Sequence, residues 1–177
     1  MRRWMTIMML TCAITLLVIY TFHDSGDDLD NLARNGTIQA DAAVKASVEI
    51  VIEAPPEKVW SVLTDLNGWP QWQPDIKDAQ IAGPLESGTT FTWTAGGTRI
   101  HSRLALVEPR TRLAWTGSAW MARAVHVWKL EPLRGNKTRV KVDESMSGFA
   151  LTFFYSSKDL EESDRLWLNR LKAAAEQ

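Results

Sequence analysis

Hydrophobic and polar residues along the chain form three successive patterns. An unbroken apolar run covers residues 4–22, and a polar, acidic stretch without an apolar period covers residues 24–43. From Val44 onward, short segments alternate apolar and polar residues or repeat apolar residues every three to four positions. Alternation is typical of half-buried strands, and the longer repeat is typical of helices. The chain is therefore predicted to carry an N-terminal hydrophobic segment (1–23), a linker (24–43) and one α+β domain (44–177).

The N-terminal segment has the length and flanking charges of a membrane anchor. Two arginines precede 19 uncharged residues, Trp4 to Phe22, which would form roughly 28 Å of helix and so span an apolar bilayer core. Acidic residues follow, which predicts a single pass with a cytoplasmic N-terminus and the domain outside, periplasmic or extracellular. A cleaved signal and lipidation at Cys12 are alternatives. The absence of an Ala-x-Ala pattern and the position of Cys12 inside the run favour the uncleaved anchor.

The domain begins with a strand near Val48 and a helix opened by Pro55-Pro56, and about six further strands follow. Ser156-x-x-Asp159 resembles a capping box, and it precedes apolar residues at helical spacing over 160–174. An antiparallel sheet with one apolar face must cover that face, and the terminal helix is the available cover.

Register in the predicted hairpins places apolar side chains on one face of the sheet. The opposite face, with Arg99, His101 and Arg103, should meet water. The expected inward pairs are Phe91 with Ser102, Trp93 with Ile100, Leu104 with Trp115, Leu106 with Leu113, Trp128 with Val142, and Leu130 with Val140.

The last hairpin also brings a histidine and a carboxylate onto the apolar face. If its turn is centred near Gly135, His126 pairs with Glu144. A buried carboxylate is costly unless it is paired, and His126 is the nearest candidate partner. The two residues form either a polar grip on a ligand, an acid/base pair, or a structural pair at the end of the sheet.

Composition adds nine tryptophans against two tyrosines, which suits a large core or an apolar pocket. The net charge of −1 gives no reason to expect nucleic acid as a partner. The sequence has no metal-ligand cluster, nucleophile elbow or phosphate-binding glycine loop, so no metal or cofactor is predicted. The candidate ligand-binding residues are Trp69, Trp72, Phe91, Trp93, Leu104, Trp115, His126, Trp128, Val142 and Glu144.

Four stretches carry a family resemblance: Pro55–Trp60, Asp65–Ile76, Gly88–Phe91, and His126-Val127-Trp128 with Glu144. They resemble the polyketide cyclase/dehydrase-like branch of the START and birch-pollen-allergen (SRPBCC) superfamily. The resemblance covers about Val44 to the C-terminus. It implies a helix-grip fold, in which a curved antiparallel sheet wraps around a long C-terminal helix and leaves an apolar cavity between them.

The resemblance does not imply one reaction, because its members include binding proteins and cyclases. The first expectation is a membrane-anchored extracytoplasmic binding protein for a hydrophobic small molecule or lipid. The alternative is a polyketide cyclase/dehydratase-type enzyme that uses His126 and Glu144 as acid and base. A protein-interaction module, like the chaperone-ATPase activators of the superfamily, fits an exported domain less well.

Overall fold

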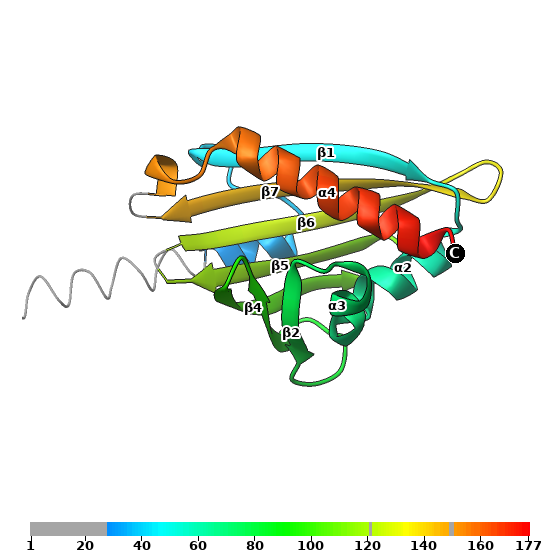
Figure 1. The fold of residues 1–177 in the computed structure, drawn as a ribbon, viewed down its shortest axis with the longest axis horizontal. Coiled ribbons are helices and arrows are strands. Elements are labelled where there is room, and N and C mark those ends of the chain that lie inside the picture. The colour runs from blue at the N-terminus through cyan, green and yellow to red at the C-terminus, as the bar shows by residue number, and fades with distance from the viewer. Residues whose placement is uncertain (1–27, 121, 149–150) are drawn as a thin grey trace, which may run out of the picture.

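One curved sheet wraps around the long C-terminal helix in the computed structural model, which describes residues 28–120, 122–148 and 151–177 (Figure 1). The described strands are antiparallel neighbours in the order β1-β7-β6-β5-β4-β3-β2. They are β1 (Val44–Ile52), β2 (Ile76–Ile81), β3 (Thr90–Ala95), β4 (Thr98–Glu108), β5 (Arg112–Ala119), β6 (Ala122–Leu133) and β7 (Lys137–Gly148). The helices are α2 (Pro56–Thr64), η1 (Leu66–Gly68), α3 (Trp69–Trp72), η2 (Leu151–Phe153) and α4 (Ser157–Ala175). The α+β class and the helix-grip arrangement are as predicted.

The predicted anchor, residues 1–23, lies outside the described residues, and so do residues 24–27 of the predicted linker. Among the residues that are described, no helix is both long and apolar enough to cross a membrane.

The predicted register is confirmed at five of the six apolar pairs and at His126–Glu144. The prediction for Leu106 is wrong, because Leu106 pairs with Ala114 while Leu113 pairs with Val107. The shift lies at Ala105, where β4 contains one extra residue. Such a bulge reverses which side chains face inward along the rest of the strand. Val107 therefore packs into the main core, and Leu106 packs on the outer face of the sheet.

The outer face is covered in part by a helix over residues 28–34, within the range predicted to be a linker. Leu29 and Ala33 are buried there against small and branched side chains of β4, β5 and β6. Asp30 accepts a hydrogen bond from Thr116 Oγ at 2.7 Å, and Arg103 lies 3.4 Å from the same carboxylate. Arg99 and His101, on the same face, are exposed as predicted.

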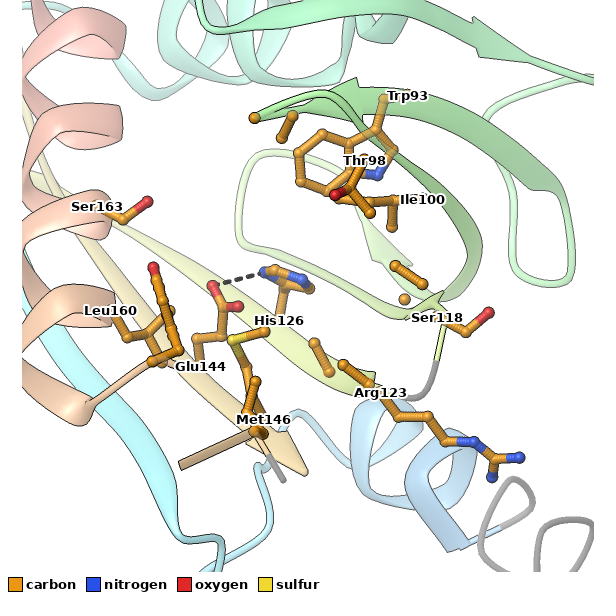
Figure 2. A pocket seen from close by; sticks show the side chains of 18 of the residues that line it. Trp93, Thr98, Ile100, Ser118, Arg123, His126, Glu144, Met146, Leu160 and Ser163 are labelled. Carbon is orange, nitrogen blue, oxygen red and sulfur yellow. Dashed lines mark ion pairs between the residues drawn. The ribbon is translucent and has the colours of Figure 1, made fainter. Parts of the chain in front are cut away.

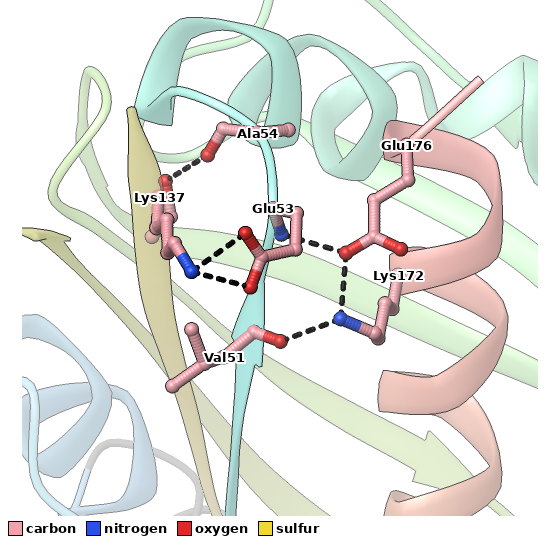
Figure 3. Close-up of polar contacts among 7 residues, drawn as sticks. Val51, Glu53, Ala54, Lys137, Lys172 and Glu176 are labelled. Atoms are coloured by element: carbon pink, nitrogen blue, oxygen red, sulfur yellow. Dashed lines mark hydrogen bonds and ion pairs between the residues drawn. The ribbon is translucent and has the colours of Figure 1, made fainter. Parts of the chain in front are cut away.

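Helix α4 lies across the inner face of the sheet and is attached to β1 near both ends. Ser156 and Asp159 form the predicted capping box at its start. At its C-terminal end, Lys172 donates to the Val51 carbonyl at 2.8 Å, and Glu176 accepts from the Glu53 backbone N–H at 2.6 Å (Figure 3). These bonds hold the C-terminal end of α4 against β1, at the end of the sheet where α2 and α3 also lie (Figure 1). We call this end of the structure the closed end.

Candidate functional site

A cavity of about 660 Å³ lies between the N-terminal half of α4 and the sheet (Figure 2). Its wall comes from the β3–β4 hairpin, the adjoining ends of β5, β6 and β7, and α4 with the segment before it. The described lining residues are Trp93, Ala95, Gly96, Thr98, Ile100, Trp115, Gly117, Ser118, Ala119, Trp120, Ala122, Arg123, Ala124, His126, Trp128, Glu144, Met146, Leu151, Phe154, Tyr155, Leu160, Ser163, Asp164 and Trp167.

The cavity brings together half of the predicted ligand-binding residues. Trp93, Trp115, His126, Trp128 and Glu144 line it. The remaining predicted residues, Trp69, Trp72, Phe91, Leu104 and Val142, belong to the packed core beyond it. Their role in ligand binding stays a prediction.

Trp69 shows why side chains fill the half of the interior at the closed end. Its side chain is fully buried, and its indole N–H donates to the Leu63 carbonyl at 2.9 Å. The ring makes edge contacts with Phe91 at 5.8 Å and with Trp93 at 5.9 Å between centroids. The pocket therefore occupies only the other half of the space under α4.

Tryptophans form an aromatic wall along the pocket. The ring of Trp115 is stacked between His126, at 4.8 Å, and Trp128, at 6.2 Å between centroids. Trp167, on α4, approaches Trp93 edge-on at 6.1 Å. Among the described residues, the buried indole N–H groups of Trp115 and Trp128 have no hydrogen-bond partner. A wall of this kind favours a large apolar ligand and offers few polar contacts.

His126 and Glu144 form the polar part of the site. His126 Nδ1 lies 2.8 Å from a Glu144 carboxylate oxygen, and both side chains are about nine-tenths buried. Because the Nδ1–H group donates a hydrogen bond to the carboxylate, the lone pair lies on Nε2 in the neutral form of the ring. A Cβ built at Gly117 would lie 3.8 Å from that nitrogen. Glycine at this position thus keeps open the space that Nε2 faces.

Asp164, on α4, adds a second buried carboxyl group that the sequence analysis missed. Its side chain is 4% exposed and shares a hydrogen bond with Glu144. Burial and then the charge of Glu144 raise the pKa of Asp164 to about 9. At neutral pH the protonated carboxyl of Asp164 therefore donates to Glu144, which also accepts from His126.

A sequence signal for Asp164 does exist. The residue lies four positions after Leu160 and three before Trp167, in the middle of the apolar face of α4. An acidic residue in an apolar helical stripe must be paired or protonated, which marks it for attention.

The described residues contain no group of three or more His, Cys, Asp or Glu side chains that could hold a metal ion. Tyr155 and Ser163 also line the pocket and are hydrogen-bonded to each other, and Thr98, Ser118 and Arg123 add further polar side chains to its wall. Burial raises the pKa of Tyr155, so this phenol is neutral at physiological pH. The site can therefore orient one polar group of an apolar ligand, or transfer a proton at His126 Nε2.

Comparison with known proteins gives one family match and many structural relatives. The profile of the family described as polyketide cyclase / dehydrase and lipid transport matches residues 43–176. No protein of curated function matches the chain.

Among solved structures, similarity extends over about three quarters of the chain. A hypothetical protein of Helicobacter pylori aligns with a TM-score of 0.68 at 22% identity, over 77% of this chain and 90% of its own. The Zhui aromatase/cyclase of a Streptomyces species aligns with a TM-score of 0.60 at 17% identity, over 75% and 93%. A START superfamily protein of Mycobacterium smegmatis aligns with a TM-score of 0.59 at 16% identity, over 75% and 94%. At these identities the similarity establishes the fold.

Proposed function

The chain belongs to the polyketide cyclase/dehydrase and lipid transport family of the START superfamily, and on that premise we propose that it binds a hydrophobic small molecule or lipid in the pocket under α4. We further propose that residues 1–23 hold the domain at the outer face of a membrane. The membrane-anchoring proposal rests on the uncharged run of residues 4–22 and on the charges that flank it.

The observation that carries the proposal is the cavity itself. Its volume of about 660 Å³ falls in the usual range of small-molecule sites. Its wall is dominated by tryptophan and aliphatic side chains, so the ligand class is apolar.

The polar part of the wall gives the bound molecule an orientation. His126 Nε2 faces the space beside Gly117 and can accept a hydrogen bond from one ligand hydroxyl or amide. Because Glu144 fixes the ring from the other side, this acceptor is held in place before the ligand arrives.

The test is to purify the full chain in detergent, extract it with organic solvent and identify apolar compounds by mass spectrometry. Ala124→Phe would place a ring in the pocket, because Ala124 lies on the inner face of β6. Thr94→Phe, on the outward side of β3, is the matched control. We expect a compound with the wild type and the control and none with Ala124→Phe. If the wild type yields none, and no lipid from a panel raises its melting temperature, the proposal is wrong.

A second candidate, an enzyme of the cyclase or dehydratase type, is favoured by the position of His126. Nε2 would remove a proton from a carbon next to a carbonyl group of a polyketide-like chain, and that carbon would attack a second carbonyl to close a ring. The imidazolium would then give the proton to the alkoxide oxygen of the attacked carbonyl group. Until that step, Glu144 stabilises the positive charge of the imidazolium.

The enzyme hypothesis predicts that Glu144→Gln or His126→Gln abolishes turnover of a β-polyketone analogue while the fold is kept. Conversely, two variants that only melt at lower temperature, with turnover unchanged, would assign the pair a structural role.

A further inference from the structure

Three large aromatic side chains are exposed together at the mouth of the pocket. Trp120 is 95% exposed, Phe153 is 84% exposed and Phe154 is 83% exposed. Trp120 also has a φ of +51°, a left-handed conformation that favours glycine or asparagine. Neither the core nor the turn explains a tryptophan at this position, so its ring is available to a partner.

The three rings come from two segments that lie side by side. Trp120 directly follows β5 and stands one residue away from the start of β6 at Ala122, and Phe153 and Phe154 lie in and after η2, between β7 and α4. Ala122, at the start of β6, pairs with Gly148, at the end of β7. Trp120 and Phe154 both line the pocket, so these two rings flank its opening, and Phe153 is the chain neighbour of Phe154.

The N-terminal end of the described chain lies at this same end of the sheet. Asp28 and Ser147, the latter one residue from the end of β7, border one surface hollow. Only five residues, 23–27, separate the uncharged run from this point. Fully extended, that connection spans at most about 20 Å. A bilayer holding residues 4–22 would therefore lie close to the mouth.

We propose that the mouth of the pocket rests on the surface of this bilayer, with Trp120, Phe153 and Phe154 in the interfacial layer. The inference rests on the membrane anchoring proposed above. Aromatic side chains are enriched in the interfacial layer of membranes, where one part of the ring system is apolar and another is wet. A pocket that opens there exchanges an apolar ligand with the lipid phase directly, because the ligand does not have to cross water.

The test places one fluorophore beside the rings and one far from them. Cys12→Ser removes the only native cysteine. Thr152→Cys then labels the exposed neighbour of Phe153 and keeps all three rings, while Arg134→Cys labels the β6–β7 turn, away from the mouth. Each full-length protein is reconstituted into phosphatidylcholine vesicles that contain a headgroup spin-labelled lipid.

We expect the label at position 152 to shift its emission to shorter wavelength and to be quenched by the spin-labelled lipid, and the label at 134 to do neither. Replacing the three rings together (Trp120→Ser, Phe153→Ser, Phe154→Ser) should abolish quenching at 152 and leave the melting temperature unchanged, since the rings are exposed. Because apolar contacts are not screened by salt, high salt should not release the three rings from the vesicle surface.

Two results would overturn the inference. One is a label at 152 that stays in water in the presence of vesicles. The other is a label shielded from aqueous iodide yet not quenched by lipid, which would show that a second copy of the chain covers the rings. Ligand binding is measured separately by extraction. Quenching at position 152 without a copurified compound would therefore contradict the proposed ligand binding and still support the contact between the mouth and the bilayer.

Discussion

Replacing Asp164 by asparagine should stabilise the protein at neutral and alkaline pH. Asp164 is buried against Glu144, and its pKa in the folded protein is raised to about 9. In the unfolded chain the same group has a pKa near 3.9. The folded state therefore binds this proton more tightly, and the unfolding free energy decreases as the pH rises from about 4 to about 9.

The size of the effect follows from the two pKa values. Each pH unit within that window costs up to about 1.4 kcal/mol, so at pH 7 the buried carboxyl lowers stability by up to roughly 4 kcal/mol relative to pH 4. An asparagine amide has nearly the same shape and still donates an N–H to Glu144, but it does not titrate. The stability difference between the variant and the wild type should therefore grow with pH.

The assay is denaturant unfolding of the full chain in detergent at several pH values. Between about pH 5.5 and pH 8, we expect the advantage of Asp164→Asn to increase by 1 kcal/mol or more, with an upper bound of roughly 3.5 kcal/mol. Asp41→Asn, at an exposed position, is the control and should follow the wild type. Parallel pH curves for Asp164→Asn and the wild type would show that Asp164 does not hold a proton in the folded state.

Three further changes test the architecture. Ser156→Ala removes the hydrogen-bond acceptor at the start of α4 and should cost about 1 kcal/mol in unfolding free energy. Trp69→Ala should cost roughly 3–5 kcal/mol, because it leaves a cavity in the closed half and removes the donor to the Leu63 carbonyl. Gly117→Ala should leave the melting temperature nearly unchanged, because its Cβ meets only ordinary contacts, yet weaken ligand binding measured by titration, since the methyl group narrows the space that His126 Nε2 faces.

Alternation along the strands was sufficient to predict which side chains share the inner face of the sheet, but it does not separate those that line the pocket from those in the packed core. One register error would have turned the whole apolar set outward, so the pairing of His126 with Glu144 was strongly determined. The bulge at Ala105 was not predictable in this way. A single small residue changes the alternation there without a glycine or proline to mark it.

Sequence patterns were less informative where function departs from the rules of folding. Asp164 lies on the otherwise apolar face of α4, and the sequence analysis assigned it no role. Most aromatic residues are buried, and no pattern in the sequence marks Trp120, Phe153 and Phe154 as exposed. Their exposure depends on where two turns meet in space, and periodicity carries no information about that.

The helix over residues 28–34 has a consequence for where this protein can be cut. The family match begins at residue 43, but the packed unit begins earlier. A fragment starting at residue 43 would uncover Ala105, Ala114, Val125 and Val127, which are buried beneath Leu29 and its neighbours. Such an apolar patch on an antiparallel sheet promotes aggregation. Fragments that follow the family boundary should therefore precipitate, whereas those that begin at or before residue 28 keep the outer face of the sheet covered.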